Sequence, residues 1–378
     1  MKLTADWLTS RPAQTVCALL TDAGFEAWFV GGCVRNTLLN APVADLDLST
    51  NARPDVVVGL AKDAGLRVVP TGIEHGTVTI VVEKTPIEIT TFRRDVATDG
   101  RRAVVAFADT LLEDARRRDF TMNALYADMD GNIADPLGGL PDLQARHVRF
   151  IEDPERRIQE DYLRILRFFR FHAWYGDVDA GIDADGLAAC AMHVEGIQTL
   201  SKERIGQEML KLLAAPDPAP AVASFASCGG LMQVLPGADH GALSVLVHVE
   251  GVAGLEPDAI RRLAVLGGQD VTENLRLSKA KARRYGLLRD DMSTAEIAYR
   301  FGADAGMDKL ALQAASLGCE IDPKAIEFVH FAARQHFPIT AADFMPALQG
   351  AALGRAIKDA ESRWIASGFM LGKDALLG

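Results

Sequence analysis

Apolar residues alternate with polar ones, or run in short β-branched stretches, through much of the first hundred residues. This pattern predicts strands, because successive side chains of a strand point to opposite faces of a sheet. The predicted strands are 27–30, a strand carrying Asp45 and Asp47, 66–70, 77–82 and 87–92. Helical spacing of apolar residues predicts helices at 4–23, 33–39 and 54–64. We therefore expect an α+β fold with a mixed sheet of about five strands and helices on one face.

The pattern changes after this region. Residues 93–118 are highly charged, and the first half of the segment has no clear period, which predicts a mobile loop. The segment 135–143 is rich in Pro, Gly and Asp, as a domain boundary often is. Beyond it we find no strand pattern of any length, so we expect the remainder to be nearly all helical.

Composition narrows the class of protein. A chain of 378 residues can form two or three domains, and its 49% hydrophobic and 24% charged residues are typical of globular proteins. Neither a secretory signal nor an apolar run of about 18 residues is evident, so no membrane segment is expected. Five scattered cysteines without a CxxC pair predict reduced thiols in the cytoplasm and argue against structural zinc.

One stretch, FVGGCVRNTLLNAPVADLDLST at 29–50, combines two chemical features. Gly31 and Gly32 would let the backbone approach a ligand before a helix begins, which suits a triphosphate, and Arg35 follows as a further phosphate contact. Asp45 and Asp47 are two residues apart and would share one strand face. Two carboxylates beside an anion cradle are what two Mg²⁺ ions need in nucleotidyl transfer. Taken singly, these features are more often an ordinary turn and solvated surface acids.

A third carboxylate follows in the strand IEITTF. Glu88 is out of phase with Ile87 and Ile89, and a carboxylate in an apolar strand is costly unless it has a partner. An edge-strand glutamate facing water is the ordinary interpretation. Beside Asp45 and Asp47, we interpret Glu88 as a base or an outer metal ligand.

The stretch 29–50 resembles the signature of the polymerase-beta-like nucleotidyltransferases, in particular class II tRNA nucleotidyltransferases (CCA-adding enzymes) and bacterial poly(A) polymerases. The sequences RRDFTMNAL and DPLGGLPDL are similar to the family's RRDFTxNAL and DPxGGxxDL. The resemblance implies that Arg118, Asp119 and Asn123 contact the incoming nucleotide, and that 93–118 is the flexible loop needed to add the final A. The family usually has Asp where this chain has Asn36, which keeps the hydrogen-bonding ability and loses the charge.

The segment IQEDYLRILRFFRF predicts a helix with an apolar stripe. Asp161 and Arg164 are three residues apart, so they would be neighbours on another face, where an ion pair is the ordinary interpretation. Cytosine and adenine both present an amino donor beside a ring-nitrogen acceptor, whereas uracil and guanine present the reverse. One carboxylate and one guanidinium could therefore select C and A.

This segment is similar to the family's EDxxR motif at Glu160, Asp161 and Arg164. The resemblance implies that Asp161 and Arg164 are the amino-acid template for base selection and that Glu160 orients them. Arg167 extends the pattern.

A basic cluster lies in the last third of the chain. The net charge is −11, yet residues 275–289 contain no acid and six basic residues, Arg276, Lys279, Lys281, Arg283, Arg284 and Arg289. Local clusters rather than net charge govern attraction to phosphates. A solvated helix face is one interpretation, and we favour contact with an RNA backbone.

The resemblance implies a polymerase-beta-like nucleotidyltransferase head at 1–140, a helical neck that recognises the base at 141–215, and a helical body and tail that bind tRNA at 216–378. It implies addition of C, C and A to the 3′ end of tRNA from CTP and ATP, with two Mg²⁺ ions.

Three alternatives remain open. A poly(A) polymerase shares these motifs, but its best-known relatives carry a basic C-terminal extension, and the tail here is not basic. A non-catalytic RNA-binding relative would have no reason to keep three costly carboxylates together. A small-molecule nucleotidyltransferase would not need the long helical half. The sequence leaves the oligomeric state open.

Overall fold

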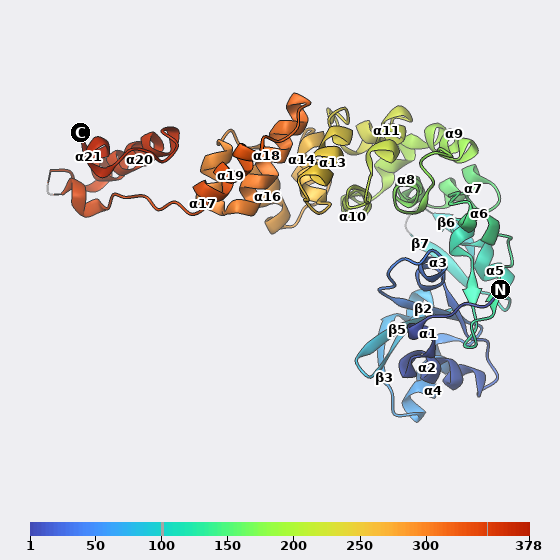
Figure 1. The fold of residues 1–378 in the computed structure, drawn as a ribbon. Helices are drawn as coiled ribbons and strands as arrows, with labels where there is room; N and C mark the ends of the chain where they lie inside the picture. The colour runs from blue at the N-terminus through green and yellow to red at the C-terminus, as the bar shows by residue number, and fades with distance from the viewer. Residues whose placement is uncertain (100–101, 346) are drawn as a thin grey trace. The chain divides into compact units, whose positions relative to one another are not determined.

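The computed structural model describes residues 1–99, 102–345 and 347–378 (Figure 1). The chain forms two compact units, the first made of 1–208 with 220–234 and the second of 209–219 with 235–378. The two units alternate along the chain, so the polypeptide passes between them more than once. The predicted boundaries near 140 and 215 divide the chain more finely and stay predictions.

A mixed sheet is the centre of the first unit, as predicted. Its seven strands lie in the order β3-β4-β5-β2-β1-β8-β9, and β2 and β5 are its one parallel pair. The strands are β1 Trp28–Val30, β2 Leu46–Thr50, β3 Arg67–Gly72, β4 Thr77–Val82, β5 Thr85–Thr91, β8 Tyr126–Ala127 and β9 Ile133–Ala134. The five predicted strands are all present. We expected about five and missed β8 and β9, because two residues are too short for an alternating pattern.

Helices pack against this sheet: α2 contacts β4 and β5, and α4 contacts β3 and β4. The helices of this region are α1 Asp6–Thr9, α2 Arg11–Thr21, α3 Gly32–Leu38, α4 Pro54–Asp63 and α5 Leu111–Arg116, with 3₁₀ turns at Ile73–His75 and Thr121–Asn123. The prediction of one helix over 4–23 is wrong. Ser10 separates α1 from α2, because its Oγ accepts a hydrogen bond from Ala13 N and Pro12 is best placed in a first helical turn.

The prediction of a loop over 93–118 is wrong for most of that segment. Strands β6 Arg93–Asp99 and β7 Arg102–Phe107 form an antiparallel pair, and α5 follows. Thr110 caps α5 by accepting a hydrogen bond from Glu113 N. The many charges obscured the β-branched residues of β7. Residues 100 and 101 of the predicted loop lie outside the described residues.

Helices make up the rest of the first unit, as predicted. They are α6 Leu140–Gln144, α7 Pro154–Glu160, α8 Leu163–Tyr175, α9 Ala184–Met192, most of α10 Lys202–Leu213, α11 Ala219–Ser227 and α12 Gly230–Val234, with a 3₁₀ segment at Val194–Thr199. Phe120, just after α5, packs on Phe150 and on Phe171 of α8, with ring centroids 5.0 and 4.9 Å away. Phe225 of α11 packs on Phe169 of α8 at 5.0 Å. These aromatic contacts join the sheet region and the helices that follow it into one unit.

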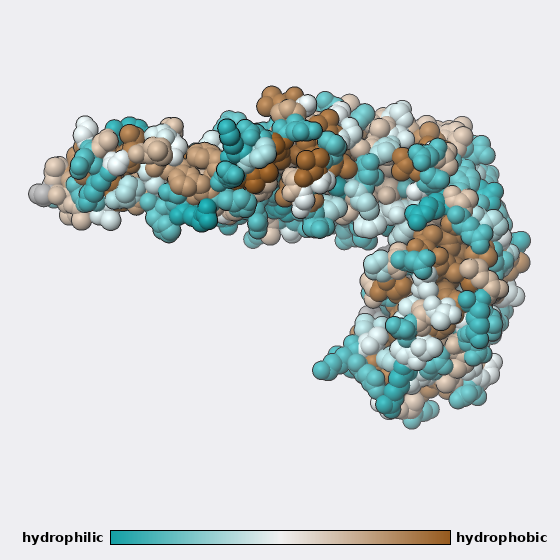
Figure 2. Space-filling model, viewed as in Figure 1, coloured by the Kyte–Doolittle hydropathy of each residue, from teal (hydrophilic) through white to brown (hydrophobic). Residues whose placement is uncertain are grey.

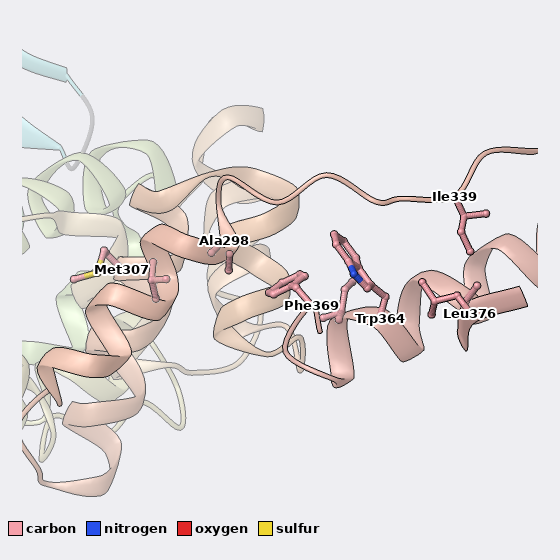
Figure 3. Packing of buried hydrophobic residues seen from close by; sticks show 10 residues of the cluster. Ala298, Met307, Ile339, Trp364, Phe369 and Leu376 are labelled. Atoms are coloured by element: carbon pink, nitrogen blue, oxygen red, sulfur yellow. The ribbon is translucent and has the colours of Figure 1, made fainter. Parts of the chain in front are cut away.

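The second unit consists of helices joined by loops, and its described residues form no strand. Its further helices are α13 Leu243–Val252, α14 Ala259–Leu266, α15 Val271–Asn274, α16 Lys279–Arg289, α17 Thr294–Phe301, α18 Ala303–Leu317, α19 Pro323–Ala332, α20 Gly350–Ala366 and α21 Lys373–Leu377, with a 3₁₀ turn at Ala341–Phe344. Trp364 and Phe369 pack edge to face at 4.9 Å in a core cluster that also contains Ala298 and Met307 (Figure 3). Figure 2 shows apolar residues gathered over the part of this unit that holds α13, α14 and α18. Within the described ranges, no helix is long and apolar enough to cross a membrane.

Candidate active site

Two carboxylates, Asp47 and Glu88, lie on one face of the central part of the sheet, and the charge of a third, Asp45, acts on Asp47. Leu46 and Leu48 are 8% and 1% exposed, which places Asp47 on the opposite face of β2, as predicted. Asp47 is the register partner of Glu88 on the parallel strand β5, so these two side chains stand next to each other. Asp45 directly precedes β2 and is exposed. The structure thus brings together the carboxylates that the sequence identified.

The charges at this face favour a bound cation. Burial, together with the negative charges of Glu88 and Asp45, raises the pKa of Asp47 to about 6, and the positive charge of Arg118 opposes this rise. A divalent ion would relieve this repulsion, and carboxylate oxygens are ligands that Mg²⁺ prefers. Among the residues with described side chains, no three His, Cys, Asp or Glu groups form a closed metal site. The carboxylates of Asp45 and Asp47 are of the ligand type that Mg²⁺ takes together with water and phosphate oxygens, and their role as metal ligands stays a prediction.

The predicted glycine turn lies beside an arginine. Gly31 has a φ of 71°, a conformation that glycine adopts at no steric cost, and α3 begins at the next residue. A Cβ added at Gly31 would lie 3.7 Å from Nη1 of Arg118. The bare backbone of the turn and this guanidinium therefore face each other.

Arg118 belongs to a buried network. Its Nε donates to the Tyr126 hydroxyl at 3.1 Å, and its Nη2 donates to Ser49 Oγ at 3.2 Å and to Asp114 Oδ2 at 3.0 Å. Asp114 is fully buried, which alone would raise its pKa, but Arg118 and Arg117 hold that pKa well below its usual range.

The residues predicted from the sequence do not include Ser49, Asp114 and Tyr126. Asp114 and Arg118 are four residues apart, a spacing that brings side chains together on a helix. The interpretation of 93–118 as a loop excludes this helical spacing, so the pairing of Asp114 with Arg118 was not predicted.

Four predicted nucleotide-binding residues form a second chain of contacts. Asp119 Oδ2 accepts from Arg167 Nε at 2.7 Å, and its Oδ1 accepts from Asn123 Nδ2 at 2.8 Å. Asn123 Oδ1 accepts in turn from Arg35 Nη1 at 2.5 Å. Burial alone would raise the pKa of Asp119, but Arg167 and Asn123 hold it well below its usual range.

Arg35 is more enclosed than a phosphate contact usually is. It is 6% exposed, its Nη2 donates to the Tyr175 hydroxyl at 2.8 Å, and the Tyr175 ring lies 4.1 Å from its guanidinium carbon. Its place in the phosphate cradle stays a prediction. Tyr175, which the sequence analysis did not identify, is a further member of this cluster.

Asn36 uses both ends of its amide. Its Oδ1 accepts from Arg35 Nε at 3.1 Å and Nη2 at 2.8 Å, and its Nδ2 donates to the Pro42 carbonyl at 2.8 Å. An aspartate would keep the contact with Arg35 and could not donate to Pro42. Asn36 therefore ties α3 to the irregular segment that leads to Asp45.

The predicted base-selecting pair is arranged differently from the prediction. Helix α7 ends at Glu160 and α8 begins at Leu163, while Asp161 between them is extended, with φ −156° and ψ 105°. The prediction that Asp161 and Arg164 share one helix face is therefore wrong. Asp161 Oδ1 accepts from Leu163 N at 3.1 Å, in keeping with the preference of Asp for helix starts over helix interiors.

Each member of this pair has a different partner. Arg164 donates from Nη1 to Glu160 Oε2 at 2.6 Å, and its Nη2 donates to the Arg117 carbonyl at 2.9 Å. Asp161 Oδ2 accepts from Arg204 of α10 at 2.7 Å, a residue that the sequence analysis did not identify. Glu160 thus contacts Arg164, and the orienting role of Glu160 and the base-selecting role of Asp161 and Arg164 stay predictions.

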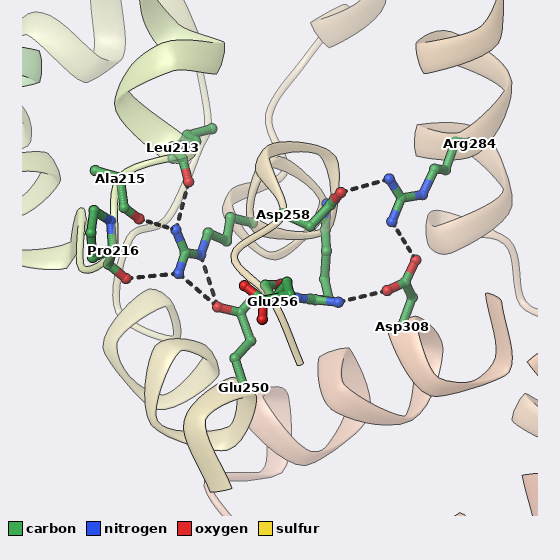
Figure 4. A network of polar contacts seen from close by, with 10 residues as sticks. Leu213, Ala215, Pro216, Glu250, Glu256, Asp258, Arg284 and Asp308 are labelled. Carbon is green, nitrogen blue, oxygen red and sulfur yellow. Dashed lines mark hydrogen bonds and ion pairs between the residues drawn. The ribbon is translucent and has the colours of Figure 1, made fainter. Parts of the chain in front are cut away.

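The basic cluster of the second unit divides into two groups. Lys279, Lys281 and Arg283 are exposed on α16, and Arg276 is exposed just before it. Arg284 instead donates to Asp258 Oδ2 at 2.7 Å and to Asp308 Oδ2 at 2.6 Å (Figure 4). We predicted Arg284 as an RNA contact, but its guanidinium is already held by two carboxylates.

Arg284 is the outer part of a buried ion-pair network. Glu250, 2% exposed, accepts from Arg261 at 2.8 Å and from Arg262 at 2.9 Å, and Arg261 also donates to Asp308 at 2.7 Å (Figure 4). Arg262 donates further to three backbone carbonyls, those of Leu213, Ala215 and Pro216. The network joins the end of α10 to α13, α14, α16 and α18.

Two family models match this chain. Residues 27–149 match the poly A polymerase head domain, and residues 181–241 match the probable RNA and SrmB-binding site of polymerase A. The first match covers the sheet, the three carboxylates and the Arg118 network.

Curated relatives carry the name CCA-adding enzyme. The one from Limosilactobacillus fermentum is 34% identical over 352 residues, which cover 87% of this chain and 83% of the relative. The one from Levilactobacillus brevis is 42% identical over 231 residues, 60% of this chain, and the chain spans only 56% of that relative's length.

Solved structures agree with this grouping. The Bacillus stearothermophilus CCA-adding enzyme in complex with CTP has a TM-score of 0.74 and 26% identity, covering 95% of this chain and 94% of that one. The Thermotoga maritima CCA-adding enzyme complexed with tRNA shares the fold, with a TM-score of 0.68 and 16% identity. The match covers 96% of this chain and 92% of the Thermotoga maritima chain. The sheet, its carboxylates and the helical remainder define a nucleotidyltransferase of the poly A polymerase head type. The chain belongs to the CCA-adding enzyme family.

Proposed function

We propose that this protein adds C, C and A to the 3′ end of tRNA from CTP and ATP, without a nucleic-acid template. The observation that carries the proposal is the pairing of Asp47 with Glu88 on one sheet face, with Asp45 just before β2 and Arg118 beside the Gly31 turn. The names of the relatives, and the CTP named with the Bacillus stearothermophilus structure, support this choice of substrates.

The chain's own residues account for most of the chemistry. Asp45 and Asp47 would hold two Mg²⁺ ions, which supply activation of the RNA 3′-hydroxyl and neutralise charge on the triphosphate. Arg118 would add a fixed positive charge at the phosphates, where preorganised donors stabilise developing charge. Glu88, next to Asp47, is placed to accept a proton or to hold a water ligand.

Base selection is proposed for Asp161 and Arg164. A carboxylate accepts from the amino group shared by cytosine and adenine, and a guanidinium donates to the adjacent ring nitrogen. The contacts of Arg164 with Glu160 and of Asp161 with Arg204 support this role, because each holds one member of the pair in place.

The exposed basic residues of the second unit are proposed to contact tRNA phosphates. Arg276, Lys279, Lys281 and Arg283 lie within eight positions of one another at the surface, and such clusters supply most of the affinity for nucleic-acid backbones. Arg284 would support this surface from below through Asp258 and Asp308. A tRNA substrate also implies that the protein works in the cytoplasm.

A poly(A) polymerase is the second candidate, because residues 27–149 match a head domain described for that enzyme. The two functions differ in the number of nucleotides added and in the choice of RNA. The site geometry is compatible with either.

Extension of a tRNA that lacks its CCA end, analysed at single-nucleotide resolution, tests the proposal. With Mg²⁺, CTP should add two residues, and ATP should then add one and stop, while Asp47→Asn adds none. A long ladder of A residues on unrelated RNA would favour the poly(A) polymerase. No incorporation by the unaltered protein would overturn the enzymatic proposal.

A further inference from the structure

Arg118 has protein partners at two of its three nitrogens. Nε and Nη2 donate to Tyr126, Ser49 and Asp114, as described above. Nη1 makes no hydrogen bond to any residue whose side chain the structure describes, and a Cβ at Gly31 would lie 3.7 Å from it. One end of the guanidinium is therefore fixed, and the other end points to the bare backbone of a turn.

The Tyr126 hydroxyl connects the two charged groups. It accepts from Arg118 Nε at 3.1 Å and donates to Asp114 Oδ2 at 2.9 Å. Tyr126 is fully buried on β8, paired with Val30 just before the glycine turn, and Ser49 on β2 is fully buried as well. Neither hydroxyl can contact a ligand directly. We therefore expect that the loss of either hydroxyl affects a bound ligand through Arg118.

A guanidinium is planar, so fixing Nε and Nη2 also fixes the direction of Nη1. We propose that Asp114, Tyr126 and Ser49 are positioning residues that aim Nη1 of Arg118 at the phosphates of the incoming nucleotide. A donor held in place before the ligand arrives loses no further freedom on binding, which strengthens its contact with a phosphate oxygen. The inference rests on the proposed function for the identity of the ligand.

A purely structural network would have a different form. The ion pair between Asp114 and its two arginines would stabilise the fold without either hydroxyl. Both hydroxyls donate to Asp114 and also accept from Arg118, whereas Arg117, which pairs with Asp114 at 2.7 Å, has no contact with either hydroxyl. The geometry thus singles out Arg118.

Tyr126→Phe in the full chain is the most direct test, because it keeps the ring and removes both hydrogen bonds of the hydroxyl. Affinity is measured by calorimetry without RNA, so that no turnover occurs. We expect CTP and inorganic pyrophosphate to bind about fivefold to tenfold more weakly, the scale of one hydrogen bond. Cytidine, measured as a competitor of CTP, should bind unchanged because it carries no phosphate. Ser49→Ala should shift the same ligands in the same direction.

A double-mutant cycle separates positioning from general loosening of the fold. In an Arg118→Ala background, Tyr126→Phe should weaken CTP binding no further, because the group that it positions is gone. An equal loss in both backgrounds, a parallel loss of cytidine binding, or unchanged CTP affinity in Tyr126→Phe would each overturn the inference. If the unaltered protein binds CTP as expected but does not extend tRNA, the proposed function fails and the positioning role stands.

Discussion

The two units each contain a buried network of arginines and carboxylates. The networks differ in the hydrogen-bond partners of the terminal guanidinium nitrogens. In the second unit, Arg262 is 1% exposed and donates only to Glu250 and to backbone carbonyls. In the first unit, Arg118 is held just as firmly by Asp114 but keeps Nη1 beside the Gly31 turn. Ion pairing with a buried carboxylate is therefore common to both, and the candidate site differs in that Nη1 of Arg118 has no hydrogen-bond partner among the described residues.

We assign different roles to the two networks, although both consist of arginine–carboxylate pairs. A buried ion pair is weak evidence for stability gained over an apolar core, yet removal of one partner leaves an uncompensated charge. The network around Glu250 joins four helices of the second unit and the end of α10, so its loss should appear in unfolding. The network around Asp114 fixes one donor, so its loss should appear in nucleotide binding.

The largest expected effect is on the stability of the second unit. Glu250→Gln leaves Arg261 and Arg262 facing a neutral amide, and the unfolding free energy should fall by about 3–5 kcal/mol. Urea denaturation measures the loss, and CTP affinity in native buffer should not change. The exposed Glu256→Gln is the matched control, with a change within about 0.5 kcal/mol. A fall in unfolding free energy as small as that of the control would mean that this network does not stabilise the second unit.

A smaller effect is expected when the planar guanidinium of Arg118 is replaced by the ammonium group of lysine. Arg118→Lys keeps the charge but cannot contact Tyr126, Ser49 and a phosphate together, so kcat/KM for CTP incorporation should fall roughly 100-fold. Arg117→Lys is the control, because Arg117 pairs with the same Asp114 and lacks the two hydroxyl contacts. Equal losses in the two variants would remove the distinction between an open and a closed donor.

The smallest effects are expected on α16, where neighbouring arginines belong to different groups. Arg283→Ala should lower the salt dependence of tRNA binding by about one unit of log–log slope, as expected for one lost phosphate contact. Arg284→Ala should leave that slope unchanged and lower the unfolding free energy by about 1 kcal/mol, since its partly exposed pairs are partly screened. Filter binding at several salt concentrations measures the slope. A lower slope in Arg284→Ala would show that Arg284 reaches RNA despite its two carboxylate partners.

Local periodicity accounts for what the sequence could predict. Alternation along the strands placed Asp47 and Glu88 on one face, because strand geometry repeats every two residues whatever surrounds it. The expected strand position of Asp45 is not observed, since β2 begins at Leu46.

Contacts between distant segments account for the errors. The break at Asp161 depends on a local cap and on Arg204, 43 residues away, neither of which helical spacing reveals. The ion pairs of Arg284 could not be predicted because its partners Asp258 and Asp308 lie outside the basic run, and its contact with RNA stays a prediction. Charge density in one segment cannot show which charges the fold neutralises.

The alternation of the two units along the chain has a practical consequence for dissection of the protein. Residues 220–234 belong to the first unit, where Phe225 is fully buried against Phe169 of α8. A truncation at the predicted boundary near 215 would uncover Phe169 and leave an aggregation-prone apolar surface. A soluble catalytic fragment must therefore extend at least to Val234. It would carry residues 209–219 without the unit that they pack with, so those residues would be the first target for a protease.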